Sequence, residues 1–298
     1  MLKQAIILIG GPTASGKSAL AMRLAGQRQG CIINADAMQV YAGLPILTAQ
    51  PSAEDRAAIP HRLYEVTDAA EASSAGKWLV LARTAIEESI KAGRVPIVVG
   101  GTGLYFDALM GGLADIPPIP YEVRAKAANF YLEVGEKKFR AELAKLDPDS
   151  AARIAKNDRQ RLVRAYEVVK HTKKTLSEWH KNKGSKEHFS AEYHLLLPHR
   201  EELYAACDKR FLSMIERGAI EEVKEFLKRG LAPTLPAMKI LGVREIASHL
   251  RGEKSLDESI AKAQQMTRNY AKRQVTWFKN RWSKSCLFGK ETINENPF

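Results

Sequence analysis

The sequence Gly11-Pro12-Thr13-Ala14-Ser15-Gly16-Lys17-Ser18 decides the fold. An apolar run from Ala5 to Ile9 precedes it, and helix-forming residues from Ala19 to Ala25 follow it. Strand, glycine-rich turn and helix in this order predict a P-loop, in which backbone N–H groups and the start of the helix surround an anion. We expect all eight residues to bind a diphosphate or triphosphate group, with Lys17 supplying a full positive charge and Ser18 placed to ligate Mg²⁺.

Two further apolar runs end beside residues that can do chemistry. The run from Cys31 to Asn34 leads to Asp36, and the run from Val95 to Val99 leads to Thr102 within a Gly-Gly-Thr-Gly turn. Helical periodicity over residues 78–92 gives the alternation of strand and helix that is typical of a parallel α/β sheet, whose ligands bind beyond the carboxyl ends of the strands. We therefore expect a P-loop NTPase-like parallel sheet flanked by helices, with the P-loop, Asp36 and Thr102 meeting in one crevice.

The residues alone leave the roles of Asp36 and Thr102 open. A carboxylate that faces a phosphate site can hold Mg²⁺ or accept a proton from a nucleophile, and an Asp after a strand can also be a helix N-cap. The Thr102 hydroxyl can donate to a phosphate oxygen or cap a helix. The glycines around Thr102 favour the close approach of a ligand.

A proline-rich segment, residues 116–120, interrupts the alternation and predicts a rigid domain boundary. The chain beyond it is helix-rich and basic, and the polar residues 181–190 predict a loop. Leu195-Leu196-Leu197 predicts a strand that returns to the sheet, and the last helix is expected over residues 256–282. The predicted domains are a core of residues 1–116 and 195–298 and a helical insertion of residues 117–194.

Positive charge is concentrated in the second part of the chain. The formal net charge is +12, and residues 1–114, with ten basic and nine acidic side chains, carry only +1 of it. A basic part beside a phosphate-binding part suggests a polyanionic partner such as nucleic acid. A protein that is merely basic would have the same composition, so charge alone does not decide between the two.

Several classes of protein are disfavoured by the sequence. No apolar run reaches the roughly 18 residues that a membrane span needs, and the N-terminus lacks the pattern of a signal peptide. We therefore expect a cytoplasmic protein without membrane contact. Cys31, Cys207 and Cys286 lie far apart, which argues against a zinc site. Their odd number, without a secretory signal, predicts a reducing compartment.

The motifs together resemble, in order, those of the tRNA dimethylallyltransferases, and the resemblance covers nearly the whole chain. The matching blocks are Gly11–Ser18, Asn34–Tyr41, Pro60–Leu63, Gly100–Tyr105, Asn157–Ala165, Leu241–Glu245 and Tyr270–Phe278. The chain departs from the usual family residues at Ser18 (usually Thr), Ala37 (usually Ser) and Gln50 (usually Lys). It resembles the bacterial form, without the zinc finger of eukaryotic members.

The resemblance implies transfer of a dimethylallyl group from dimethylallyl diphosphate to the exocyclic amine of the adenosine 3′-adjacent to the tRNA anticodon. Asp36 is then the general base, and Thr102 orients the amine and the diphosphate. The P-loop and Mg²⁺ on Ser18 hold the diphosphate leaving group, and Arg210 could reach it. The partners implied are dimethylallyl diphosphate and the anticodon arm of tRNA, and we expect a monomer.

The same resemblance implies a set of tRNA-binding residues, with Gln39 as a reader of the flipped base or its neighbour. These are Asp36, Ala37, Met38, Gln39, Thr102, Arg124, Gln160, Arg161, Leu162, Val163 and Arg164. Residues 268–290 contain seven basic and no acidic side chains, mixed with aromatic ones. Because Tyr270, Gln274 and Trp277 fall on one helical stripe, we expect that stripe and the aromatic side chains in the core and the basic side chains on a phosphate-facing surface.

Two other classes of function compete with this reading. A P-loop kinase that transfers phosphate from ATP explains residues 1–114 but not the basic remainder. A nucleotide-gated RNA-binding protein explains the charge but leaves Asp36 and Thr102 without a task.

Overall fold

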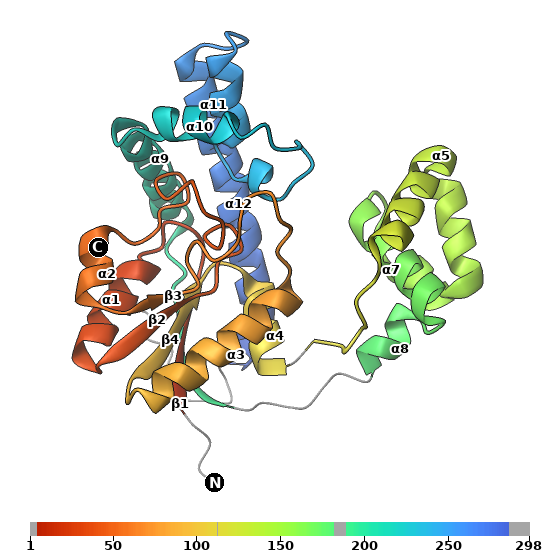
Figure 1. The fold of residues 1–298 in the computed structure, drawn as a ribbon, viewed down its shortest axis with the longest axis horizontal. Coiled ribbons are helices and arrows are strands. Elements are labelled where there is room, and N and C mark those ends of the chain that lie inside the picture. The colour runs from red at the N-terminus through yellow and green to blue at the C-terminus, as the bar shows by residue number, and fades with distance from the viewer. Residues whose placement is uncertain (1–4, 112, 182–188, 286–298) are drawn as a thin grey trace. The chain divides into compact units, whose positions relative to one another are not determined.

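The computed structural model describes residues 5–111, 113–181 and 189–285, and the chain divides into two compact units (Figure 1). The core unit comprises residues 1–110 and 187–298, and the inserted unit comprises residues 111–186. The units change at 111 and 187, whereas the proline-rich segment and the leucine run predict boundaries at 117 and 194. The chain re-enters the core unit earlier than predicted, because the last strand of the sheet begins at Ser190.

Five parallel strands form the sheet of the core unit, in the order β3-β2-β4-β1-β5. The strands are β1 (Ala5–Gly10), β2 (Gly30–Asn34), β3 (His61–Arg62), β4 (Val95–Gly100) and β5 (Ser190–Leu195). Gly10 pairs with Gly100, and Asn34 pairs with Val99, so β1, β2 and β4 end level with one another. The turns that follow these three strands therefore meet at one edge of the sheet.

The predicted strand Leu195–Leu197 lies too late in the sequence and shares only Leu195 with the strand that the structure shows. The strand is β5, Ser190–Leu195, and Leu196 already lies in the turn beyond it, where its N–H donates to the Gly10 carbonyl oxygen at 3.0 Å. β5 is an edge strand with mixed polar and apolar residues, whereas a run of leucines is typical of a central strand. Most of the predicted loop, residues 182–188, lies outside the described residues, as does Cys286.

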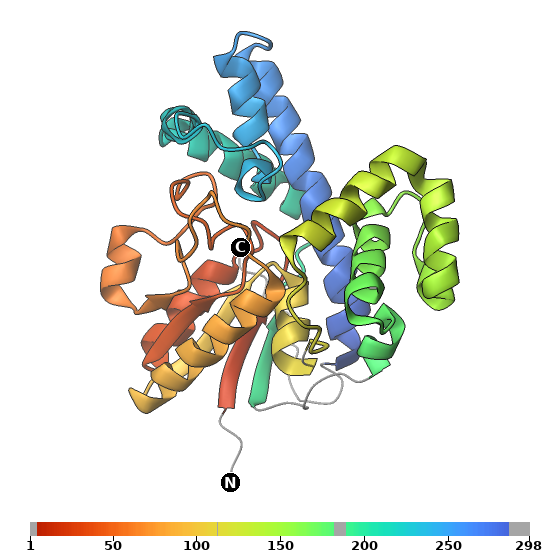
Figure 2. The same ribbon diagram turned by 45° about the vertical axis from the view of Figure 1, so that its right-hand side comes forward.

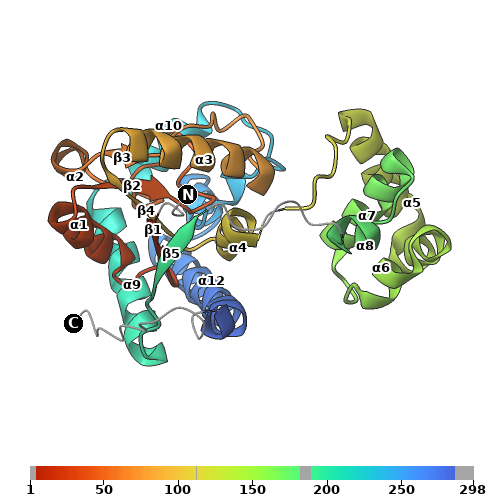
Figure 3. The ribbon, with the colours of Figure 1, turned by 90° about the horizontal axis from the view of Figure 1, so that it is seen from below.

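Helices cover both faces of the sheet (Figure 3). Their bounds are α1 (Lys17–Gln27), α2 (Ala53–Ala58), α3 (Ala75–Lys91), α4 (Gly103–Gly111), α9 (Arg200–Glu216), α10 (Ala219–Leu227), the short 3₁₀ helix η1 (Ala237–Lys239), α11 (Val243–Leu250) and α12 (Leu256–Ser285). Alternate strand residues, including Ile7, Ile32 and Ile97, pack against Leu24 of α1, while the other face carries α3 with Trp78. Figures 1 and 2 place α10 and α11 beyond the carboxyl ends of the strands.

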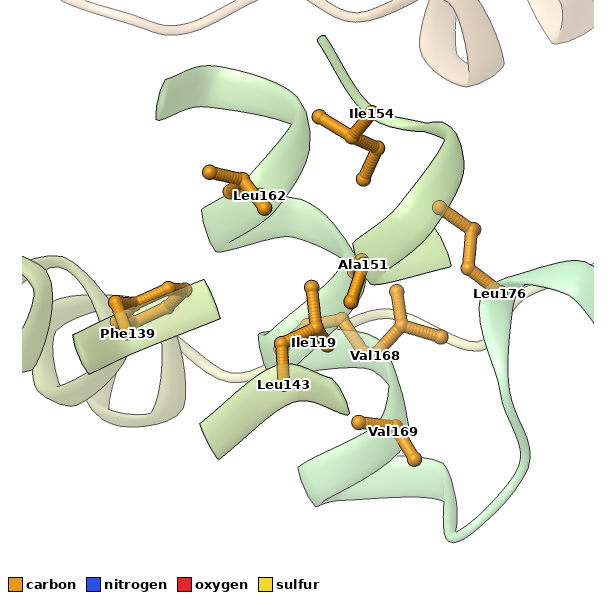
Figure 4. Packing of buried hydrophobic residues seen from close by; sticks show 10 residues of the cluster. Ile119, Phe139, Leu143, Ala151, Ile154, Leu162, Val168, Val169 and Leu176 are labelled. Atoms are coloured by element: carbon orange, nitrogen blue, oxygen red, sulfur yellow. The ribbon is translucent and has the colours of Figure 1, made fainter. Parts of the chain in front are cut away.

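The inserted unit is a small helical domain with its own core (Figure 4). Its helices are α5 (Tyr121–Leu146), α6 (Pro148–Arg153), α7 (Arg159–Thr172) and α8 (Leu176–Lys181). Gly135, with φ 72°, breaks α5 into two arms. The buried Asp147 carboxylate accepts from the N–H groups of Ser150 (3.0 Å) and Leu176 (3.1 Å), which fixes the starts of α6 and α8.

Figure 4 shows Ile119, Leu143 and Val168 at the centre of this core. Leu162 belongs to the same core and is fully buried. Its side chain packs within its own unit. Within the described ranges, none of the helices combines the length and the apolar character that crossing a membrane requires.

Candidate active site

The P-loop has the backbone path that its glycines predict. Gly16 precedes α1 with φ 83°, a left-handed conformation that glycine adopts without strain. Gly11 lies so close to the neighbouring turn that a Cβ atom would stand 2.5 Å from the Leu196 carbonyl oxygen. The Ser15 side chain is fully buried, and its hydroxyl has no hydrogen-bond partner among the residues that the structure describes. A phosphate oxygen bound in the loop would give this hydroxyl a hydrogen-bond partner.

Lys17 points into the loop, and its ammonium donates to the Pro12 carbonyl oxygen. The pKa of Lys17 is lowered from 10.5 to about 7, chiefly by burial; Asp36 opposes this shift, and the nearby Arg210 guanidinium adds to it. A polyanion beside Lys17 would restore its charge. The P-loop is therefore prepared for an anion rather than for a neutral ligand.

Asp36 is held by its own turn after β2. Its Oδ1 accepts from the Met38 N–H at 2.9 Å, and its N–H donates to Oδ1 of Asn34 at 2.8 Å. Asn34 is fully buried and also donates from Nδ2 to the Leu63 carbonyl oxygen at 3.0 Å. Asp36 thus begins a hydrogen-bonded turn and does not cap a helix.

Thr102 joins this turn to the one after β4. Its Oγ1 accepts from the Ala37 N–H at 2.9 Å, and its own N–H donates to the Ala35 carbonyl oxygen at 3.1 Å. The turns approach so closely that a Cβ atom on Gly100 would lie 2.1 Å from the Ala35 carbonyl oxygen. The Thr102 hydroxyl therefore holds the turn that carries Asp36.

These turns surround one cavity of about 120 Å³. Its polar lining includes Thr13, Lys17, Ser18, Asp36, Gln39 and Arg210, and its apolar lining includes Met38, Leu47, Phe211, Met214, Ile240 and Leu241. Asp36 and the end of the P-loop share this cavity, as the sequence leads us to expect, and Thr102 lies immediately beside its lining residue Gly101. A charged ligand with an apolar part matches such a lining.

Arg210 on α9 is the second cation of the cavity. Its Nη1 donates to Oγ1 of Thr13 at 3.0 Å, which places the guanidinium against the P-loop. Burial lowers the pKa of Arg210, and the Asp36 carboxylate opposes this shift. Lys17 and Arg210 together hold positive charge around the position of an anion in the P-loop.

Gln274 has a role that sequence reasoning missed. Its Oε1 accepts from the Thr13 N–H at 2.8 Å, and its Nε2 donates to the Gly101 carbonyl oxygen at 2.9 Å. The side chain is 5% exposed, and a Cβ atom on Gly101 would stand 2.2 Å from Nε2. An amide in the middle of an expected core stripe was the available signal, because a buried amide needs partners.

The aromatic residues of α12 divide between core and site. Phe278 and Trp282 are buried beside β1, where a Cβ atom on Gly10 would touch both rings. Trp277 covers Gly103 and is half-buried, and Tyr270 lines the cavity instead of the core. The expectation of a uniform aromatic core is therefore corrected for Tyr270.

Gln39 holds a loop in this structure. Its Nε2 donates to the carbonyl oxygens of Thr48 and Ala49, both at 2.9 Å, while its side chain lines the cavity. The neutral Gln50 is buried, donates to the Tyr41 carbonyl oxygen at 3.2 Å and accepts from Arg56 at 3.0 Å. A cation from α2 thus stands beside Gln50.

In the inserted unit, the polar residues predicted to bind tRNA lie at or near its surface. Arg124, Gln160 and Arg161 are exposed, and Arg164 forms an ion pair with Glu167 at 2.7 Å. Val163 is partly buried against the core of the unit. Five of the six expected side chains in this unit are therefore at least partly accessible, and the sixth, Leu162, is buried.

The residues present suit Mg²⁺ only in company with a diphosphate. No group of three His, Cys, Asp or Glu side chains able to hold a metal occurs in the part of the chain that the structure describes. The cavity offers the Ser18 hydroxyl beside the P-loop. This donor set fits Mg²⁺, which is commonly bound by one or two protein oxygens together with substrate phosphates and water.

Comparison with known proteins agrees with this geometry. The family model described as IPP transferase matches residues 39–281, and the model described as isopentenyl transferase matches residues 4–70. A tRNA dimethylallyltransferase of a Caulobacter species is 52% identical over 276 residues, which cover 92% of this chain and 89% of that protein. The tRNA dimethylallyltransferase of Rhodospirillum centenum is 50% identical over 277 residues, covering 92% and 88%.

Two solved structures are similar over most of the chain. A eukaryotic dimethylallyltransferase acting on tRNA has a TM-score of 0.84 at 30% identity, covering 95% of this chain and 72% of that one. The tRNA isopentenylpyrophosphate transferase of Bacillus halodurans has a TM-score of 0.65 at 33% identity, covering 94% and 88%. With a P-loop, a carboxylate and two partly buried cations around one cavity, the chain belongs to the tRNA dimethylallyltransferase (IPP transferase) family.

Proposed function

We propose that this enzyme transfers a dimethylallyl group from dimethylallyl diphosphate to the exocyclic amine of the adenosine 3′-adjacent to the tRNA anticodon. The observation that carries the proposal is the single cavity in which the P-loop residues Lys17 and Ser18 and the carboxylate of Asp36 meet. A kinase reading is not favoured, because the relatives over nearly the whole chain are prenyltransferases by name.

The diphosphate leaves as an anion when the allylic C–O bond breaks. The P-loop N–H groups, Lys17 and Arg210 lie where they would stabilise the negative charge that develops on it. Mg²⁺, when bound through Ser18, would neutralise further charge on the diphosphate oxygens. The phosphorus atoms undergo no reaction, so the P-loop holds a leaving group.

The aromatic amine must lose a proton as the new C–N bond forms. Asp36 lines the cavity with a carboxylate whose orientation is fixed by the Met38 N–H, which suits a general base. Thr102 holds the Asp36 turn through Ala37, and its hydroxyl would orient the amine and the diphosphate. The adenine must leave its stack to reach this cavity, with Met38 and Gln39 beside it.

The inserted unit, corresponding to the predicted domain 117–194, is the proposed tRNA-binding domain. Exposed Arg124, Gln160 and Arg161 give it polar and cationic side chains suited to the phosphates and unstacked bases of an anticodon arm. Residues 1–116 and 195–298 form the catalytic domain of the proposal. We further propose that the enzyme acts as a monomer and in the cytoplasm, where tRNA is available to it.

A labelling experiment tests the function. The purified protein is incubated with unmodified tRNA, Mg²⁺ and either radiolabelled dimethylallyl diphosphate or γ-labelled ATP. Label in RNA from the allylic donor and none transferred from ATP is the expected result. Phosphate transfer from ATP would support a kinase, and tRNA binding that depends on nucleotide without any transfer would support an RNA-binding protein.

A further inference from the structure

The loop of residues 44–50 closes the apolar part of the cavity in the core unit. Leu47 and Thr48 of this loop line the cavity, together with Phe211 of α9. A Cβ atom on Gly242 would stand 2.8 Å from the Leu47 side chain and 3.0 Å from Phe211, so both side chains pack against that glycine. Leu47 is therefore part of the apolar wall of the cavity, and its position depends on this loop.

Glu222 on α10 holds this loop from outside the cavity. One carboxylate oxygen accepts from the Ile46 N–H at 2.6 Å, and the other accepts from the Leu47 N–H at 2.8 Å. Burial raises the pKa of Glu222, and the two N–H groups and Arg217 oppose the rise. A half-buried carboxylate that accepts from two successive backbone N–H groups holds the loop at a specific place. Burying an ionised group costs free energy, and these two hydrogen bonds offset that cost.

The loop is also held from the other side. Gln39 donates to the carbonyl oxygens of Thr48 and Ala49, while Glu222 takes the N–H groups two residues earlier in the loop. Within the loop, the Thr48 hydroxyl donates to the Leu44 carbonyl oxygen at 2.7 Å. Removing the Glu222 carboxylate would leave two N–H groups without acceptors and would release the Leu47 end of the loop.

We propose that Glu222 is a positioning residue that sets the length of the allylic chain accepted by the enzyme, by fixing Leu47 as the end wall of the apolar pocket. The inference rests on the proposed function, because it assigns the apolar part of the same cavity to the prenyl chain of the donor. Glu222 does not line the cavity and acts only through the loop. A wall that moves admits a longer chain, whereas a fixed wall rejects it by steric exclusion.

The test compares dimethylallyl diphosphate with geranyl diphosphate, which carries twice as many carbon atoms. The measured quantity is the ratio of kcat/KM for the two donors with one tRNA, for the wild type, Glu222→Gln and Leu47→Ala. Glu222→Gln keeps the shape of the side chain but replaces one acceptor oxygen by an amide donor facing a backbone N–H. Glu221→Gln, one residue earlier and exposed on the same helix, is the matched control.

The preference for the shorter donor should fall by about tenfold or more in Glu222→Gln and in Leu47→Ala, and stay unchanged in Glu221→Gln. A variant that merely folds poorly loses active enzyme with both donors, so the ratio does not move, and thermal melting identifies that case. Leu47→Ala keeps the carboxylate and tests the wall by itself.

An unchanged ratio in folded Glu222→Gln, with a reduced ratio in Leu47→Ala, would overturn the assignment to Glu222. Unchanged ratios in both variants would overturn the end wall as well. If the wild type transfers neither group to tRNA, the proposed function fails before the ratio can be formed. The two failures are therefore distinguishable.

Discussion

At the residue scale, Asp36 combines a structural hydrogen bond with its chemical task. Oδ1 accepts from the Met38 N–H, so the carboxylate shapes its turn as well as facing the cavity. An alanine at this position would remove both contributions at once. Asparagine retains an acceptor oxygen for Met38 and removes only the basicity, so the two substitutions separate the turn from the proton transfer.

Asp36→Asn should lower kcat by about 10²- to 10⁴-fold, the usual contribution of a positioned general base. The KM for tRNA should stay within about threefold of the wild-type value, because the hydrogen-bonded turn persists. Single-turnover transfer of labelled dimethylallyl groups, with a separate tRNA-binding assay, measures the two quantities. Equal losses of binding and turnover would assign Asp36 to tRNA binding instead of proton transfer.

Substitution of Gln274 should lower both the free energy of unfolding and kcat. Gln274→Met keeps the length of the side chain but leaves the Thr13 N–H and the Gly101 carbonyl oxygen unpaired in a buried site. Each such loss costs about 1–3 kcal/mol of the free energy of unfolding. Because Gln274 joins the P-loop to the turn of Thr102, kcat should fall as the leaving group and the acceptor lose their alignment.

Urea unfolding and steady-state kinetics measure the two effects of Gln274→Met. Gln265→Met, on an exposed position of the same helix, is the matched control and should change neither quantity appreciably. A loss of stability in Gln274→Met with normal kcat in the folded fraction would reduce Gln274 to a structural role.

At the element scale, local sequence patterns predicted the strand and the helix on either side of the P-loop. The other parts of the site depend on contacts between residues far apart in the sequence. The strand, glycine turn and helix around the P-loop follow from a short segment, so the sequence was sufficient for β1 and α1. β5 was misplaced because an edge strand has little apolar signal of its own. The bond between Thr13 and Gln274 joins residues 261 positions apart, which no local pattern can reveal.

The close approach of two turns gives a prediction for β4. Gly100→Ala would place a Cβ atom 2.1 Å from the Ala35 carbonyl oxygen, a backbone atom that cannot move without displacing β2. The free energy of unfolding should therefore fall by several kcal/mol, at the upper end of the usual range for point mutations. Gly26→Ala is the matched control, because nothing lies within 4 Å of its Cβ position in α1.

In Gly26→Ala the free energy of unfolding should rise by about 0.5–1 kcal/mol, since alanine has the higher helix propensity. Urea titrations of both variants give the comparison. Equal stability of the two variants would mean that the turns after β2 and β4 are not packed as closely as described.

At the scale of the whole molecule, the boundary between the nearly neutral and the basic part of the chain is not the boundary between the two compact units. The positive charge lies beyond residue 114, and the inserted unit within that part has a hydrophobic core of its own. The sequence predicted the charge division and a helical insertion. It did not distinguish Leu162, a core residue, from its exposed neighbour Arg161, because both stand in one matching block and only packing separates them.

The exposed arginines of the inserted unit give the last prediction. If Arg124 and Arg161 bind RNA phosphates, each releases a condensed counterion, and Arg124→Gln or Arg161→Gln should reduce the slope of log K for tRNA against log salt by about 0.7–0.9. The kcat at saturating tRNA should stay unchanged, because neither residue belongs to the cavity of the core unit.

Lys91→Gln, which removes an exposed cation at the end of α3, is the control and should leave the slope unaltered. Filter binding at several salt concentrations provides the slopes. If both arginine variants keep the wild-type slope, their side chains belong to a solvated face of the helix and the phosphates are bound elsewhere.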